Sequence, residues 1–327
     1  MTGGSAIRSF FLVVKQHKEA VFKTFHVLFF LACCALIWNY TRQNQASFGR
    51  IALAAGESGF YRWFIPVLLL APLNWFLEAE KFRLLVKRLS PLGRLNSFRA
   101  HLTGTAVSLF TPNRSGEFAG KILYLPPACR AEGALLAIVC STAQLLVTIQ
   151  AGCVSFPLLF NAIGLVPLVL LLGAGGSVLW FFLPEIANAT TRIRLPASWR
   201  PAMATLGKVS YTQRGSVWGL SVVRYIVFCL QQILLFGAFG ANSDPQVLFP
   251  LIASVYLVSS IVPNIGIAEL AVRNAVSIYL YADAGIDMAT VFTVTTGIWC
   301  INIAVPALLG GLSLLSIKTV SNESPHA

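Results

Sequence analysis

Two short stretches of the sequence resemble each other: PNRSGE at residues 112–117 and PNIGIAE at residues 263–269. Each begins with Pro-Asn, continues through a turn that contains glycine, and ends on a glutamate. Each also separates two apolar segments shorter than the roughly 20 residues that a helix needs to span a bilayer. Paired interruptions in the two halves of a membrane protein indicate a transport site. The alternative is that Pro-Asn is a common turn that occurs twice by coincidence.

The composition is that of an integral membrane protein. Of 327 residues, 56% are hydrophobic and 11% are charged, whereas a soluble domain carries about 25% charged residues. The apolar runs long enough to span a bilayer are residues 21–38, 63–77, 133–153, 163–183, 218–240 and 288–315. The sequence therefore predicts an all-α polytopic membrane protein with about six transmembrane helices, in a single domain over residues 1–327.

The two interrupted segments, at about residues 97–126 and 247–282, are too short and too broken to be full spans. Irregular backbone at membrane depth is tolerated only where it is buried in protein or lines a cavity. We therefore expect two re-entrant helical hairpins with their turns inside the membrane.

The distribution of basic residues favours this arrangement. Lysine and arginine are frequent in residues 1–23, 78–101 and 184–216, less frequent in residues 39–62, and absent from residues 241–246 and 281–287. If both hairpins return to the side they came from, all the basic loops fall on one face, which the positive-inside rule places in the cytoplasm together with both termini. The hairpins then enter from opposite faces as an inverted repeat in the cell membrane.

The formal net charge of +12 does not indicate a nucleic-acid partner. The basic residues gather in loops beside the apolar runs, where they set topology and meet anionic lipid. The seven cysteines and four histidines show no metal-ligand spacing. Phosphate-binding-loop, nucleophile and zinc-protease motifs are also absent. We expect no enzyme activity and no cofactor.

The turns carry residues suited to an anionic headgroup. Asn113 or Asn264 can cap the helix that follows, and free N–H groups at a helix start attract phosphate. Arg114 adds a charge that can hold phosphate through two parallel hydrogen bonds. These residues predict a site for an anionic phospholipid or a polyprenyl-phosphate lipid.

Two glutamates have basic residues at helical spacing. Glu117 lies three residues after Arg114 and Glu269 lies four residues before Arg273, so each pair shares a helix face. An isolated carboxylate is costly inside a membrane, so ion pairs are expected. They are either structural locks on the turns or pairs that open to accept a substrate.

Two further charged residues are candidates for the site. Glu78 shares a helix face with Asn74 and is followed by Lys81. The alternative is an interfacial helix end from which Lys81 snorkels into water. Arg224, near the start of the predicted span 218–240, either snorkels in the same way or faces the cavity.

Residues 74–83, 111–117 and 262–269 together resemble the transmembrane region of lysylphosphatidylglycerol synthases. That region also occurs alone in bacterial and archaeal flippase-like proteins. The resemblance extends over about residues 10–318. It implies a flippase-like activity, in which a lipid moves between the two leaflets.

The resemblance also implies which residues form the site. By position these are Glu78 or Glu80, Arg114, Glu117 and Glu269. The synthases continue into a soluble aminoacyl-transfer domain, whereas this sequence ends at Ala327, so lipid aminoacylation is not expected.

The sequence therefore predicts a lipid flippase. The alternative is a membrane partner that does not transport and that supports an envelope glycosyltransferase or a lipid-modifying enzyme. The lack of any energy-coupling motif favours this alternative.

Overall fold

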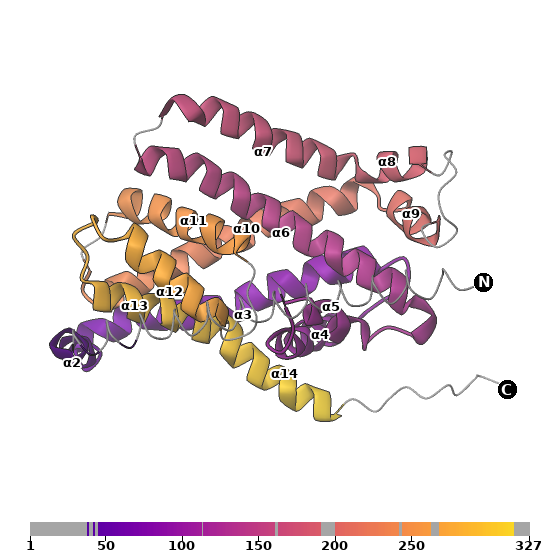
Figure 1. Cartoon of the computed structure of the whole chain (residues 1–327). Helices are drawn as coiled ribbons and strands as arrows, with labels where there is room; N and C mark the ends of the chain where they lie inside the picture. The colour runs from indigo at the N-terminus through magenta and orange to yellow at the C-terminus, as the bar shows by residue number, and fades with distance from the viewer. Residues whose placement is uncertain are drawn as a thin grey trace, which may run out of the picture.

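The fold is taken from a computed structural model of the chain. It describes residues 45–112, 114–160, 163–190, 200–241, 244–262 and 268–316, together with Trp38 and Arg42. These parts are helical and contain no β-strand (Figure 1). The predicted all-α class is confirmed.

Four helical runs among the described residues are long and apolar enough to cross a membrane. They are α3 (Ser58–Val86), α6 (Arg130–Leu159), α10 (Tyr211–Ala238), and the continuous run of α13 (Met288–Trp299), η3 (Cys300–Ala304) and α14 (Val305–Ser316). A fifth candidate is α7 (Val166–Phe181) with α8 (Leu183–Thr190), which are bent by 59° relative to each other. Five of the six predicted spans coincide with these helices. The sixth, residues 21–38, lies outside the described residues.

Helix α3 is longer than predicted. Its predicted span ended at residue 77, but the helix continues to Val86. Glu78 and Lys81 are therefore inside the helix and are buried, with 4% and 0% of their surface exposed. They pair with each other three residues apart, so the polar residues do not mark a helix end. The interpretation of Lys81 as a snorkelling residue is wrong.

Each of the two interrupted segments forms a pair of shorter helices. The pairs are α4 (Arg94–Ser108) with α5 (Gly116–Ile122), and α11 (Pro245–Ile261) with α12 (Ala268–Leu280). In the first pair the backbones touch, because a Cβ atom built on Gly120 would lie 2.6 Å from the Cα atom of Gly104. In the second pair, Arg273 of α12 contacts Tyr256 of α11. Both segments therefore fold back on themselves.

The two helix pairs lie towards opposite ends of the molecule (Figure 1). At one end, α2 (Gln45–Ala54) lies near the starts of α11 and α13, and Ile51, Asp244 and Asp287 line a common hollow. At the other end, α8 and α9 (Arg200–Gly207) lie beyond α4 and α5. There the side chain of Arg88 donates to the carbonyl of Lys208.

Helix α4 is enclosed between α5 on one side and α14 on the other. Its contact with α14 is made through Gly310, where a Cβ atom would overlap the backbone of Leu102. Thr103, Thr105 and Ser108 of α4 are fully buried. Small residues allow this close backbone approach between helices.

Two apolar clusters make up the core, one towards each end. One includes Phe60, Phe236 and Tyr281, and the other includes Phe82 and Trp180.

Between the two clusters the long helices carry polar residues. These are Asn74, Glu78 and Lys81 on α3, Gln144 on α6, and Ser221 and Arg224 on α10. This polar layer positions the candidate site.

Candidate functional site

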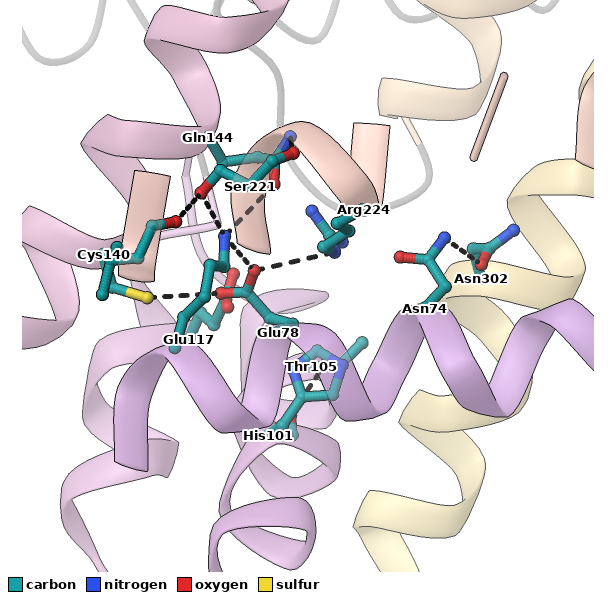
Figure 2. Close-up of polar contacts among 12 residues, drawn as sticks. Asn74, Glu78, His101, Thr105, Glu117, Cys140, Gln144, Ser221, Arg224 and Asn302 are labelled. Carbon is teal, nitrogen blue, oxygen red and sulfur yellow. Dashed lines mark hydrogen bonds and ion pairs between the residues drawn. The ribbon is translucent and has the colours of Figure 1, made fainter. Parts of the chain in front are cut away.

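Glu78 is at the centre of the polar layer. One carboxylate oxygen lies 2.7 Å from Nζ of Lys81, and the other lies 3.0 Å from Nζ of Lys121. Nε of Arg224 lies 3.6 Å from the first oxygen. Figure 2 shows the Glu78 carboxylate between Arg224 and the thiol of Cys140. Three helices therefore supply cations to one buried carboxylate.

Lys121 joins Glu78 to Glu117. Its Nζ atom lies 2.7 Å from a Glu117 oxygen, four residues earlier on α5, and the lysine side chain is fully buried. The predicted partner of Glu117 was Arg114, and this prediction is wrong. Arg114 lies in the turn before α5, with a φ of 57°, so it does not share a helix face with Glu117.

Capping of the following helix by Asn113 stays a prediction, because the described residues before α5 resume only at Arg114. The residue at the cap position of α5 is Ser115, and the first helical N–H, that of Gly116, donates to Thr111 Oγ1 at 2.7 Å. Asn113 and Asn264 themselves lie outside the described residues. A helix of seven residues whose first N–H is already bonded gives little support to an anion site at its start.

The predicted ion pair between Glu269 and Arg273 is confirmed. The two groups are 2.6 Å apart, one turn from each other on α12, and both are buried. Arg273 also donates to the hydroxyl of Tyr256 at 3.3 Å and lies 4.6 Å from the centre of that ring. These contacts fix the guanidinium beside α11.

Polar side chains from α6, α10 and η3 complete the layer. Lys81 donates to Gln144 at 3.1 Å and to Ser221 at 3.2 Å. Asn74 donates to Asn302 at 3.0 Å (Figure 2).

Asn302 lies in η3, a π-helical turn. Pro306, four residues after Asn302, has no N–H to bond the Asn302 carbonyl, which accounts for the local change of helix type.

A cavity of about 330 Å³ opens beside this network. The charged residues that line it are Glu78, Arg114, Glu117, Arg224 and Arg273, together with His101. The structure thus brings five predicted site residues to one cavity. Glu269 does not line it and instead holds Arg273 in place. Of the two interpretations of Arg224, the one in which it faces the cavity is confirmed.

Several polar atoms at this cavity have no hydrogen-bond partner within the described part of the chain. Besides the Tyr225 hydroxyl and one oxygen of Glu78, they include four nitrogen atoms, which are Nε of Arg114, Arg224 and Arg273 and Nδ1 of His101. All four are buried, and the 3.6 Å contact of Arg224 to Glu78 is too long for a hydrogen bond. Buried polar atoms are usually bonded, so these four atoms are free to bond a water molecule or a ligand.

The sequence reasoning missed Lys121, His101 and Asn302. The spacing of four residues between Glu117 and Lys121 could have indicated their pairing, as it did for Glu269 and Arg273. No local signal places His101 or Asn302 at the cavity, because that depends on how α4 and η3 pack against α3.

Comparison with known proteins found no matching protein family, curated protein or solved structure.

Proposed function

We propose that this chain is a membrane protein that binds the anionic headgroup of a lipid in the central cavity and moves the lipid between leaflets. The observation that carries the proposal is the meeting of Arg114, Arg224 and Arg273 at one cavity. They come from the turn of the first helix pair, from α10 and from the second helix pair. Arginine suits this role because its planar guanidinium binds phosphate oxygens in pairs.

The arrangement of the helix pairs supports transport rather than binding alone. The pairs lie towards opposite ends of the molecule (Figure 1), and residues near both turns line the cavity, Arg114 from the first and Ser260 from the second. In our proposal both pairs are re-entrant hairpins that form an inverted repeat, as in transporters whose site lies at the repeat interface. The resemblance to the flippase-like region of lysylphosphatidylglycerol synthases is part of the same proposal.

Lipid exchange in reconstituted vesicles tests this function. Purified protein in vesicles should accelerate the exchange of fluorescent phosphatidylglycerol, phosphatidic acid or polyprenyl phosphate between leaflets. Arg114→Gln should slow the exchange at least tenfold, because a hydrogen bond to a charged group contributes about 1.5–3 kcal/mol.

The matched control for this experiment is Arg99→Gln. Arg99 is an exposed arginine on α4, so its replacement should leave the exchange rate unchanged. The proposal fails if the unaltered protein accelerates none of the three lipids. In that case the membrane partner without transport activity becomes the better interpretation.

The proposed orientation has its own test. With the native cysteines replaced, Lys208→Cys and Asp283→Cys should react with a membrane-impermeant maleimide from opposite sides, Lys208→Cys from the cytoplasm. Both positions are exposed. Lys208 directly follows α9, and Asp283 lies between α12 and α13, which are at the opposite end of the molecule from α9 (Figure 1). Labelling from the same side would contradict the inverted repeat, because the two helix pairs could not then enter from opposite faces.

A further inference from the structure

We infer that the cavity prefers a headgroup with two negative charges, a phosphate monoester, over a phosphodiester with one. This inference rests on the proposed function and specifies its substrate class. It is drawn from the balance of charge at the cavity and from the unpartnered polar atoms around it.

The charges of the polar layer do not cancel among the described residues. Each glutamate has a cation on its own helix. These pairs are Glu78 with Lys81, Glu117 with Lys121, and Glu269 with Arg273. Arg114 and Arg224 remain without a carboxylate of their own, although Arg224 approaches Glu78 at 3.6 Å.

Two positive charges are therefore in excess beside the cavity. Both side chains are partly buried, with 26% of the Arg224 side chain exposed, and an uncompensated charge becomes more costly as burial removes it from water. A phosphodiester would neutralise one of these arginines and leave the other uncompensated. A phosphate monoester carries about −1.5 to −2 charges at neutral pH and would compensate both.

The unpartnered polar atoms indicate the same ligand. Arg114, Arg224 and Arg273 each have a buried Nε–H without an acceptor, and His101, with 4% of its surface exposed, has a free Nδ1. A phosphate monoester has three terminal oxygens that accept hydrogen bonds strongly. A phosphodiester has only two such oxygens, so the three guanidinium groups would have to share them.

Competition binding tests the preference. The protein, in nanodiscs of phosphatidylcholine, is loaded with fluorescent phosphatidic acid, which is then displaced by unlabelled competitors. Dioleoyl phosphatidic acid should compete at least tenfold better than dioleoyl phosphatidylglycerol, which has the same chains but a diester headgroup. Equal competition by these two lipids, or stronger competition by the diester, would overturn the inference.

Other competitors identify the source of the phosphate monoester. Polyprenyl phosphate shares the headgroup but not the chains, so competition equal to that of phosphatidic acid assigns recognition to the phosphate. Inorganic phosphate and glycerol 3-phosphate lack a membrane anchor. If they compete as well as the lipids do, the ligand is a free phosphate and the lipid assignment is wrong.

Charge variants separate the inference from a general loss of binding. The unaltered protein should prefer the monoester by at least tenfold, which is about 1.4 kcal/mol. Arg224→Gln lowers the excess positive charge from two to one and should reduce this preference to less than about threefold. Arg224→Lys keeps the charge and should keep most of the preference, and Arg99→Gln should keep all of it. An unchanged preference in Arg224→Gln would contradict the charge argument.

The two proposals fail in different ways. If the unaltered protein exchanges phosphatidylglycerol as well as it exchanges phosphatidic acid and binds both equally, the function stands and the inference fails. If it binds the monoester but exchanges no lipid, the inference stands for binding and the transport function fails.

Discussion

Replacing Lys121 with methionine should destabilise the protein by ~3–5 kcal/mol, the cost of breaking a buried ion pair from one side. Lys121 is fully buried and contacts both Glu78 and Glu117. Methionine fills a similar volume but leaves the carboxylate of Glu117 without its cation. We expect thermal unfolding in detergent to occur at a much lower temperature, with a large loss of monodisperse protein in gel filtration.

Two further variants test the cause of this effect. Lys208→Met removes an exposed lysine and should leave the unfolding temperature unchanged. Lys121→Met combined with Glu117→Gln removes both members of the pair and should recover part of the lost stability, because Glu78 still has Lys81. If Lys121→Met unfolds at the same temperature as the unaltered protein, the buried ion pair does not contribute to stability in the way described.

The second large effect is expected at the contact between α4 and α14. Gly310→Ala would place a methyl group against the backbone of Leu102, where no side chain can rotate away. Overpacking costs ~1–3 kcal/mol or more, and we expect a cost at the upper end because backbone must move. Thermal unfolding of the purified variant measures it.

The neighbouring glycine supplies a matched control. A Cβ atom on Gly311 meets nothing within 4 Å, and alanine has a higher helix propensity than glycine by about 1 kcal/mol. Gly311→Ala should therefore be neutral or stabilising. The close contact between the helices is refuted if both variants unfold at the temperature of the unaltered protein.

The class of fold could be predicted because length and apolarity alone identify helices that can cross a membrane. The runs at 133–153 and 218–240 were placed correctly for this reason. The end of α3 was misplaced because Glu78 and Lys81 were taken to mark the membrane surface. In the folded protein they bond each other and the neighbouring helices, so burial does not leave them without partners.

The site was predictable in part. Arg273 and Glu269 lie within one helix, where a spacing of four residues is enough to predict their pairing. Arg114 and Glu117 are separated by the point at which α5 begins, and no helical spacing applies across it. The meeting of Gln144, Ser221 and Lys81 depends on how three helices pack, which spacing along one helix does not determine.

The pairing of each glutamate within its own helix has a consequence for movement. If α5 tilts away from α3, Lys121 leaves Glu78 but remains with Glu117, and Glu78 keeps Lys81. In the same way, α12 carries Glu269 and Arg273 together. Helices α5 and α12 can therefore shift without separating Glu117 or Glu269 from its cation. Such a shift breaks the contact between Lys121 and Glu78, but every glutamate keeps one cation throughout, so no carboxylate is left bare on the way.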